Sequence, residues 1–582
     1  MRKTKIICTL GPSTDTKEIL KDMMLSGMNV ARMNFSHDVH KTHKKRVDLV
    51  KELREELNLP VALLLDTRGP EIRTKDYKNG SVDLKDGDLF SIRCYDSIGD
   101  ENGVSVNYED LYKDLHKNDR VLIDDGLIEL EVKNIEDKDI ICKVLNSGTL
   151  SNKKSVNIPG IRIKLPYMSD KDKEDILFAI KNDFDFIAAS FIRDISDLKC
   201  LREFMDSNGG SKIKIISKVE SKEGVDNIKD IIRLSDGIMI ARGDMGVEIH
   251  FEELPVLQKQ IIRLCNRSGK PVITATQMLD SMIKNPRPTR AETSDVANAI
   301  FDGTSAIMLS AETSVGKYPV DVVKTMSKIA LNTEQNINYE KRFREQDIKA
   351  TSTITSAISY STCSTAHNLG ANAIITVTKS GTTARMISKF RPACPIVAPT
   401  ILKKIFYQLS LSWGVTPIFT KEKSDTDAIL KQAVDKTLEL GKVKDGDLVV
   451  LTGGFPSKMS GTTNMLKVHI VGNVLMKAKG LNNKVASGNL YVVKDDNEDE
   501  ILEGFTRGGV LVVSKSTLKL VSLLREASAV ITEEDSQSNM AIGAIALGIP
   551  VLYDASDATE ILRSGTLVTV DAKRGEVIKG IG

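Results

Sequence analysis

The chain has 582 residues, of which 27% are charged, and its 81 basic and 79 acidic side chains leave a formal net charge of +2. A chain of this length is expected to divide into about three or four domains, because one hydrophobic core stops growing at about 250–300 residues. The near balance of charge excludes a general polyanion-binding protein, since no basic field would attract nucleic acid. The aromatic content of 5% also disfavours a surface that stacks bases.

The seven cysteines are scattered and form no CxxC pair, so we expect reduced core thiols and neither a disulfide framework nor a zinc site. The N-terminal residues run directly into a predicted strand, and we therefore expect no signal peptide. No apolar run approaches the roughly 18 residues that a membrane span needs. These features predict a cytoplasmic enzyme without nucleic acid or membrane partners.

Short apolar runs alternate with amphipathic segments such as 41–57, 171–182 and 252–266. This alternation predicts a parallel α/β fold, and eight such units favour a (β/α)8 barrel over a doubly wound sheet, which rarely has eight repeats. The predicted barrel strands are 5–9, 29–34, 62–66, 186–190, 214–218, 237–241, 271–275 and 306–310.

The regular alternation is interrupted after the third predicted strand. Residues 68–163 show short alternating runs with Gly and Asp turns, which predict a small inserted β domain, a β-barrel. The barrel itself is predicted to comprise residues 1–67 and 164–340. A second α/β domain follows at 341–473, with strands predicted at 373–378, 396–399, 448–452 and 468–471. A last domain is predicted at 474–582, and its acidic run 495–500 is expected to be a solvated loop.

Polar side chains follow several of the predicted barrel strands, at the end where such barrels place their functional groups. Lys218 and Glu220 are two residues apart and would point the same way from one strand. Asp244 leaves the next strand beside two glycines, which allow a ligand to approach the backbone closely. One lysine, two acids and a Gly-Asp turn predict a site for a divalent metal and a phosphorylated substrate, although a surface ion pair would leave the same pattern.

Six segments in this order resemble the pyruvate kinase family: 33–37, 65–73, 216–220, 241–248, 275–279 and 286–292. The resemblance covers about residues 1–473 and includes the inserted β domain, which would be the nucleotide lid. It implies the transfer of a phosphoryl group from phosphoenolpyruvate to ADP, giving pyruvate and ATP in the last step of glycolysis. It also implies a homotetramer and makes residues 341–473 an allosteric regulatory domain.

The resemblance assigns the catalytic roles to Lys218, Arg32 and Thr276. Lys218 would stabilise charge on the transferring phosphoryl group, and Arg32 would hold that group from the other side, as guanidinium matches phosphate oxygens. Thr276 would lie near the carbon that is protonated, although water or Ser310 could also donate this proton. For Arg32 a structural role would need an acidic partner, and the sequence alone suggests none.

Glu220 and Asp244 offer hard oxygen ligands that suit Mg²⁺ or Mn²⁺, although one of them could instead only pair with Lys218. The backbone N–H groups of Gly243 and Asp244, at the predicted start of a helix, would bind the substrate carboxylate. Phosphoenolpyruvate would therefore contact Arg32, Gly243, Asp244 and Thr276.

A potassium site is implied by the all-oxygen set Asn34, Ser36, Asp66 and Thr67, and Glu71 supports it because the family's potassium-dependent members have an acid there. Capping and turn hydrogen bonds are the alternative for Ser36 and Thr67. The resemblance also implies that His37, Arg73 and Lys154 contact the nucleotide phosphates, and Ser155 departs from the glycine usual after that lysine.

The segment 376–385 predicts a strand, a turn of small hydroxyl residues and a helix start, which is the chemistry of a phosphate cradle. It resembles the loop at which the family binds phosphorylated activators, with 451–456 and 461–463 as the opposite wall. An ordinary capped turn would look the same, and a sugar bisphosphate, sugar monophosphate or nucleotide monophosphate all remain open as activator. The implied effector residues are Thr378, Lys379, Ser380, Gly381, Thr382 and Thr383.

Residues 474–582 resemble the swivelling phosphohistidine domain of phosphoenolpyruvate-utilising enzymes, on the evidence of the segment 541–551. Counting back from Pro550 places Asn539 where the phosphorylated histidine would lie, and no histidine follows His469. An amide cannot carry a phosphoryl group, so we expect a structural or interface role. Asn539 thereby argues against an enzyme that phosphorylates its own histidine. A non-catalytic metabolite sensor on the same fold is the other alternative, although Arg32, Lys218, Glu220, Asp244 and Thr276 are all present.

Overall fold

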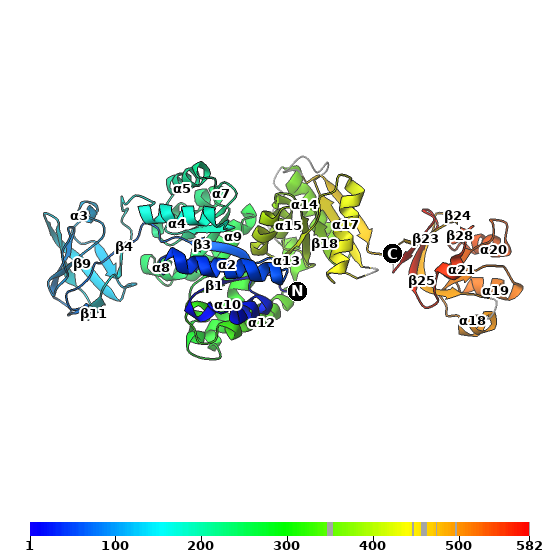
Figure 1. Ribbon diagram of the computed structural model, residues 1–582, viewed down its shortest axis with the longest axis horizontal. Coiled ribbons are helices and arrows are strands. Elements are labelled where there is room, and N and C mark those ends of the chain that lie inside the picture. The colour runs from blue at the N-terminus through cyan, green and yellow to red at the C-terminus, as the bar shows by residue number, and fades with distance from the viewer. Residues whose placement is uncertain (346–352, 445–446, 455–462, 473, 495–496, 581–582) are drawn as a thin grey trace. The chain divides into compact units, whose positions relative to one another are not determined.

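A computed structural model describes residues 1–582 except 346–352, 445–446, 455–462, 473, 495–496 and 581–582 (Figure 1). The chain forms two compact units. The first consists of Met1–Ile348 with Leu402–Pro417, and the second of Lys349–Ile401 with Ile418–Gly582. Each unit is described by itself below.

The first unit is built around a closed barrel of eight parallel strands in the order β1-β17-β16-β15-β14-β13-β3-β2. The strands are β1 Lys5–Thr9, β2 Val30–Asn34, β3 Ala62–Asp66, β13 Phe186–Ala189, β14 Lys214–Val219, β15 Gly237–Ala241, β16 Val272–Ala275 and β17 Ala306–Leu309. The predicted (β/α)8 barrel is therefore confirmed, and each strand lies within one residue of its predicted bounds. Nearly every residue in these strands is buried, which explains why continuous apolar runs identified them.

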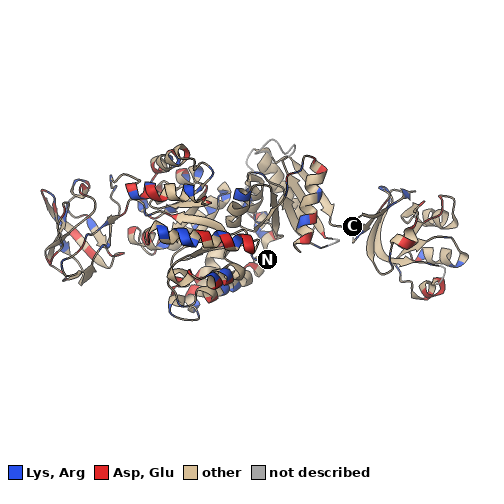
Figure 2. Cartoon of the chain, in the orientation of Figure 1, with Lys and Arg blue, Asp and Glu red and all other residues tan. Residues whose placement is uncertain are grey.

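The strands alternate with helices, and many Lys, Arg, Asp and Glu residues of this unit lie on these helices (Figure 2). The predicted helices at 41–57, 171–182 and 252–266 are present as α2 His40–Glu56, α4 Asp170–Lys181 and α9 Leu254–Ser268. The remaining helical segments are η1 Pro12–Thr14, α1 Lys17–Ser26, α5 Ile195–Ser207, α6 Lys222–Asp226, α7 Ile228–Leu234, α8 Arg242–Glu248, η2 Asp280–Ile283, α10 Arg290–Asp302, α11 Ala311–Ser314, α12 Pro319–Gln335 and α13 Tyr339–Glu345.

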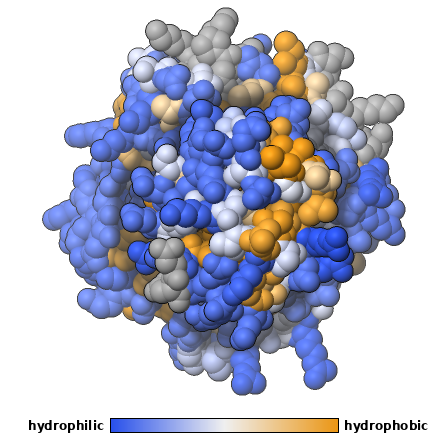
Figure 3. All heavy atoms as spheres, turned by 90° about the vertical axis from the view of Figure 1, so that its right-hand side faces the viewer, coloured by the Kyte–Doolittle hydropathy of each residue, from blue (hydrophilic) through white to orange (hydrophobic). Residues whose placement is uncertain are grey.

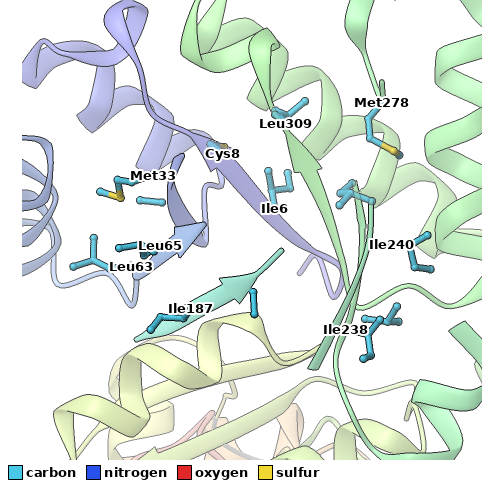
Figure 4. Close-up of a cluster of buried hydrophobic side chains, with 14 of the residues drawn as sticks. Ile6, Cys8, Met33, Leu63, Leu65, Ile187, Ile238, Ile240, Met278 and Leu309 are labelled. Atoms are coloured by element: carbon cyan, nitrogen blue, oxygen red, sulfur yellow. The ribbon is translucent and has the colours of Figure 1, made fainter. Parts of the chain in front are cut away.

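Side chains of the barrel strands alternate between two cores. Ile6, Leu63 and Leu65 belong to the core between strands and helices (Figure 4), whereas Ile7 and Leu64 belong to the barrel interior. The same alternation on β14 places Ile216 in the interior core. Lys218 and Glu220 follow it at two-residue steps, so both side chains lie on the interior side at the carboxyl end of the barrel.

The segment Leu402–Pro417 packs with the barrel, although it lies within the range 341–473 predicted as the second α/β domain. It contains α16 Lys403–Gln408 and η3 Leu409–Leu411. Phe406, Tyr407 and Leu411 join the interior core of the barrel strands. Because Lys5 begins β1 and donates through Nζ to the carbonyl of Val415 at 2.6 Å, this segment covers the amino-terminal end of the barrel.

The buried Lys5 ammonium makes barrel stability depend on pH. Burial, with Arg2 nearby, lowers the pKa of Lys5 from 10.5 to about 7. Between these values the unfolded chain binds more protons than the folded one, so stability rises with pH over this window. From pH 7 to pH 9 we expect the free energy of unfolding of the native chain to rise by about 2–3 kcal/mol relative to that of Lys5→Met.

The measurement is denaturant unfolding at several pH values, followed by the fluorescence of Trp413, the single tryptophan, which is 4% exposed in this unit. If the free energy of unfolding changed with pH in the same way for the native chain and Lys5→Met, the expected shift in the pKa of Lys5 would be contradicted.

The insertion after β3 is almost entirely β structure and has its own hydrophobic core, as predicted. A seven-stranded sheet has the order β4-β12-β8-β9-β10-β6-β7, and β11 pairs with β5 separately. Its elements are β4 Ile72–Arg73, β5 Ser81–Leu84, β6 Leu89–Arg93, β7 Gly103–Ser105, α3 Leu111–Asp114, β8 Arg120–Ile123, β9 Ile128–Glu136, β10 Asp139–Val144, β11 Gly148–Ser151 and β12 Ser155–Asn157.

The second unit begins with an α/β sheet of order β20-β19-β18-β21-β22. Strand β20 was not predicted, because Pro417 and Trp413 interrupt an otherwise short apolar run. The elements are α14 Ile354–Asn368, β18 Ala373–Thr376, α15 Thr382–Lys389, β19 Ile396–Thr400, β20 Val415–Phe419, α17 Thr426–Glu439, β21 Leu448–Gly453 and β22 Met465–Ile470.

The last part of the chain forms an eight-stranded sheet of order β23-β30-β29-β25-β26-β27-β28-β24. Its elements are β23 Val474–Lys477, β24 Lys479–Gly480, β25 Val485–Val492, α18 Glu498–Gly504, β26 Val510–Val513, α19 Leu518–Ser522, η4 Leu523–Arg525, β27 Ala529–Thr532, α20 Asn539–Leu547, β28 Val551–Tyr553, α21 Ala558–Ile561, β29 Leu567–Asp571 and β30 Glu576–Lys579. Hydrophobic residues gather on the face viewed in Figure 3, and Ile542, Ile545 and Leu547 of α20 are exposed.

Two expectations need correction. The acidic run predicted as a loop lies partly outside the described residues, and its remainder, Glu498–Glu500, forms the first turn of α18, where acidic side chains favour helix formation. The cysteines are not all core residues, since Cys200 is exposed and Cys394 is half-buried. Within the described ranges, no helix is both long and apolar enough to span a bilayer.

Candidate active site

A cluster of buried charges lies at the carboxyl ends of β2, β3 and β14. Asp66 accepts a hydrogen bond at Oδ2 from Arg32 Nε (2.6 Å) and one at Oδ1 from Lys218 Nζ (3.1 Å). The β2/β3 register, which pairs Arg32 with Leu64 and Asn34 with Asp66, produces this contact. Asp66 is therefore the acidic partner of Arg32 that the sequence did not suggest. Burial opposes ionisation of Asp66, but the charges of Arg32 and Lys218 outweigh it and lower its pKa.

Lys218 Nζ donates hydrogen bonds to two acceptors and forms an ion pair with a third oxygen. In addition to Asp66, Nζ lies 2.8 Å from Ser190 Oγ and 2.9 Å from Glu220 Oε1. Burial disfavours the charged form, yet Asp66, Glu220 and the nearby Asp244 raise the pKa of Lys218. The side chain therefore remains cationic at neutral pH in a site from which water is largely excluded.

Glu220 is fully buried and its two oxygens are in different environments. Oε2 accepts a hydrogen bond from the backbone N–H of Phe191 (2.6 Å). Oε1 has Lys218 nearby but no hydrogen bond of good geometry. Burial, together with the charge of Asp244, raises the pKa of Glu220 to about 8, and Lys218 opposes this shift.

These two carboxylates fit a hard divalent cation. Glu220 presents a buried oxygen with unused acceptor capacity, and Asp244, in the first turn of α8, is half-buried and within electrostatic range. Among the described residues no group of three or more His, Cys, Asp or Glu side chains could hold a metal. A cation here would therefore have these two carboxylates and complete its shell with water and substrate oxygens, as Mg²⁺ does.

Thr276 and Gly243 lie together at the ends of β16 and β15. Thr276 Oγ1 accepts the Gly243 N–H at 2.9 Å and lies 2.6 Å from the carbonyl of Ala275. Thr276 and Gln277 have φ values of 67° and 52°, in the left-handed region that disfavours residues with a side chain. The Gly243 N–H, predicted to bind the substrate carboxylate, and the Thr276 hydroxyl, predicted to lie near the carbon that is protonated, are therefore hydrogen-bonded to each other.

Arg242, which the sequence reasoning did not single out, holds this strained loop. Its guanidinium donates to the carbonyls of Ala275 (3.1 Å) and Thr276 (2.6 Å), and it pairs with Asp295 at 2.7 Å. Arg242 lies within the family-like segment 241–248, and its position next to Gly243 could have identified it from the sequence. Asp295 has no comparable signal in the sequence.

The four residues of the predicted potassium set lie at the ends of β2 and β3 or directly after them. Asn34 Oδ1 accepts the Ser36 N–H at 3.1 Å. Thr67 is 5% exposed, and its Oγ1 accepts the Ser190 N–H at 3.1 Å. Of the capping and turn hydrogen bonds considered as the alternative for Ser36 and Thr67, that of Thr67 is made by its hydroxyl and that of Ser36 by its backbone N–H. Asp66 bridges Arg32 and Lys218.

The predicted nucleotide contacts fall into two places. His37 follows β2, and its carbonyl accepts from His43 Nε2 at 2.9 Å. Arg73 and Lys154 belong to the inserted domain and are paired there, with Glu71 at 2.7 Å and Asp124 at 2.9 Å respectively. Among the described residues, no hydrogen bond or ion pair joins these two cations to the barrel cluster.

The predicted effector turn has the expected local structure in the second unit. Thr378 Oγ1 accepts the Gly381 N–H at 2.9 Å, and Gly381 has a φ of 79°. Ser380 and Thr382 share a hydrogen bond of 3.0 Å, and α15 begins at Thr382. Thr383 contacts Thr463 at 2.8 Å, on the predicted opposite wall, whereas 455–462 lie outside the described residues. Lys379 completes the turn.

Two neighbours of the cluster were missed because no site residue was predicted from the fourth barrel strand. Ser190 was predicted as its last residue, and Phe191 follows it; both contact the cluster. In the last domain, Asn539 is the first residue of α20 and is exposed at the surface, with Ser538 as the helix cap.

Comparisons with known proteins identify the family of the chain. The family models for the pyruvate kinase barrel domain, the pyruvate kinase alpha/beta domain and the mobile domain of PEP-utilising enzymes match residues 1–323, 356–469 and 505–575. Pyruvate kinases from Bacillus licheniformis and Geobacillus stearothermophilus are 47% and 46% identical, over 100% of this chain and 99% of theirs. The crystal structure of a pyruvate kinase from Cryptosporidium parvum, 40% identical, superposes with a TM-score of 0.77 over 81% of this chain and 96% of that one. The chain therefore belongs to the pyruvate kinase family of enzymes.

Proposed function

We propose that this chain transfers the phosphoryl group of phosphoenolpyruvate to ADP, giving pyruvate and ATP in glycolysis. The observation that carries the proposal is the pairing of Arg32 and Lys218 with one buried carboxylate, Asp66, beside the second carboxylate Glu220. Two cations and a metal-binding acid in one buried cluster suit a reaction in which charge on a phosphoryl group must be neutralised.

In this mechanism Arg32 and Lys218 bind the phosphoryl oxygens. Both cations are held by Asp66 before substrate arrives, so little reorganisation accompanies the transfer. Glu220 and Asp244 would hold Mg²⁺ or Mn²⁺, which supplies further positive charge to phosphoryl oxygens when bound. The unused acceptor capacity of Glu220 Oε1 supports this role.

The backbone N–H groups of Gly243 and Asp244 bind the substrate carboxylate. On binding, the Gly243 N–H exchanges its contact with Thr276 Oγ1 for a substrate oxygen. The Thr276 hydroxyl then turns its proton from the Ala275 carbonyl toward the carbon to be protonated. Thr276 then holds the proton at Oγ1, directly or through water or Ser310. Arg242 keeps the loop in place through its contacts with the carbonyls of Ala275 and Thr276.

We further propose a K⁺ site formed by Asn34, Ser36, Asp66 and Thr67, with His37, Arg73 and Lys154 as contacts of the nucleotide phosphates. The turn at Thr378–Thr383 would bind a phosphorylated allosteric activator, and the assembly would be a homotetramer. The predicted domain limits at 67/68, 163/164, 340/341 and 473/474 also stand as proposals, with Leu402–Pro417 associated with the barrel.

The potassium proposal is tested by Glu71→Lys. The Glu71 carboxylate is 13% exposed and pairs with Arg73. A lysine here would supply a positive charge near the proposed site and release Arg73 from its acidic partner. We expect stimulation of turnover by K⁺ over Na⁺ to fall from at least about tenfold to less than about threefold, since a fixed ammonium replaces a bound cation. Asp76→Lys, at an exposed position of the same domain, is the control, and unchanged stimulation in Glu71→Lys would refute the site.

The reaction itself is tested by ³¹P NMR of the purified chain with phosphoenolpyruvate, ADP and Mg²⁺. We expect the phosphoenolpyruvate signal to be replaced by the γ-phosphate of ATP in equal amount, with no transfer when ADP or the divalent cation is left out. Consumption of phosphoenolpyruvate without ATP formation, or phosphorylation of the protein itself, would contradict the proposal.

A further inference from the structure

The turn formed by Ser190 and Phe191 lies at the centre of the cluster, between the ends of β3 and β14. Ser190 is 1% exposed. Its hydroxyl accepts from Lys218 Nζ at 2.8 Å and donates to the carbonyl of Thr67 at 2.6 Å. The backbone N–H of Ser190 donates to Thr67 Oγ1 at 3.1 Å, so the serine is fixed to the β3 end through both its main chain and its side chain.

Phe191 has a φ of 53°, which is rare for an aromatic residue and costs about 1 kcal/mol or more. This conformation directs its N–H to Glu220 Oε2 at 2.6 Å. The turn also packs closely on Gly69, since a Cβ there would lie 2.9 Å from the Ser190 carbonyl oxygen. Strain at Phe191 and close approach at Gly69 both indicate a backbone held in place by its surroundings.

We propose that the Ser190–Phe191 turn is a positioning element that orients the Lys218 ammonium and holds the Glu220 carboxylate, so that Glu220 Oε1 stays available to a cation. The inference rests on the proposed function, because it concerns the same site. Lys218 Nζ lies 2.9 Å from Glu220 Oε1, with the two side chains 11% and 0% exposed, yet Oε1 has no hydrogen bond of good geometry. The Ser190 hydroxyl gives the ammonium a neutral acceptor, and the Phe191 N–H restrains one carboxylate oxygen.

The two contacts have separate consequences. Ser190 sets where the Lys218 ammonium points, which matters when charge develops on the phosphoryl group. Phe191 fixes Glu220 through Oε2 and leaves Oε1 available to a cation, as partners of metal ligands generally do. Ser190 and Phe191 are thus positioning residues, since neither is required to touch substrate or metal.

The first test is Ser190→Ala. A hydrogen bond to a charged group is lost from Lys218, so kcat should fall about 10- to 100-fold, with the KM for phosphoenolpyruvate changed by less than about threefold. The dissociation constant for Mn²⁺, measured by electron paramagnetic resonance without substrates, should stay within about twofold because Glu220 is untouched. Ser217→Ala is the matched control, since Ser217 is also buried on β14 and bonds only to Ser235 among its described side-chain contacts.

The second test replaces Phe191 by its α-hydroxy analogue, which turns the backbone N–H into an ester oxygen and leaves the ring in place. The Mn²⁺ dissociation constant should rise about tenfold, whereas Phe191→Gly, which keeps the N–H and accepts the positive φ, should change it by less than about threefold. Both measurements need no turnover, so they remain decisive if the native chain fails to form pyruvate. An unchanged Mn²⁺ constant in the ester variant, or a kcat of Ser190→Ala equal to that of Ser217→Ala, would overturn the proposal.

Discussion

Substitution of Lys218 by methionine is expected to lower kcat for pyruvate formation by about 10³-fold or more, because the charge that stabilises the transferring phosphoryl group is removed from a buried site. Methionine preserves much of the volume of the aliphatic side chain. Asp66 keeps Arg32 as a partner at 2.6 Å, and the fold should therefore survive.

The measurements are steady-state turnover and Mn²⁺ binding, which should remain within about threefold of the native value because Glu220 and Asp244 are still present. Lys222→Met, a few residues along the chain in an exposed ion pair with Asp226, is the control and should turn over normally. Turnover by Lys218→Met near the native rate would remove the assigned role.

The second large effect is expected from Asp66→Asn, because this carboxylate holds two buried cations. Asn keeps the shape of the side chain but not its charge. Arg32 and Lys218, whose side chains are only 9% and 11% exposed, would be left without their shared partner. Removing one partner of a buried ion pair typically costs about 3–5 kcal/mol, and turnover should be lost with it.

The free energy of unfolding is measured with Trp413 fluorescence, as for Lys5. Asp236→Asn is the matched control: Asp236 also pairs with a lysine and an arginine, Lys214 and Arg202, but its side chain is 27% exposed. The control should lose clearly less stability, since solvent screens its partners. Equal losses of unfolding free energy in Asp66→Asn and Asp236→Asn would contradict the expectation that removing the buried carboxylate costs more than removing the partly exposed one.

The barrel was predictable to within one residue per strand because its strands are buried on both faces. Segments such as β3 and β15 contain no polar residue before their ends, so their limits coincide with the first polar side chain. The segment Leu402–Pro417 had no such signal. Large aromatic residues such as Phe406 and Tyr407 would be buried in whichever domain they belonged to, so the sequence does not show which core they join. The tertiary structure places them in the interior core of the barrel.

Much of the candidate site was also predictable, for a related reason. Lys218 on β14 and Glu220 directly after it share one side through the two-residue period of a strand, and Arg32 and Asp66 lie on the neighbouring strands β2 and β3. The sequence did not pair Arg32 with Asp66, because the β2/β3 register is a property of the folded sheet. Pairing across strands depends on which strands become neighbours, which the order of motifs does not specify.

The contribution of Phe191 could not be predicted from residue types. Its backbone N–H is the functional group, and its positive φ would normally indicate glycine. Ser190 was within a predicted strand but was treated as its last residue. Arg242 and Asp295 form their pair between α8 and α10, two helices that the sequence does not place side by side.

The most direct test of the account is the initial rate of pyruvate formation from phosphoenolpyruvate and ADP with Mg²⁺, in K⁺ and in Na⁺, for the native chain beside Lys218→Met. We expect ADP-dependent turnover that K⁺ stimulates and that the substitution reduces about 10³-fold. Equal rates of pyruvate formation in K⁺ and Na⁺ would contradict the proposed potassium site but not the proposed phosphoryl transfer. No ADP-dependent pyruvate from the native chain in either salt would contradict the central claim.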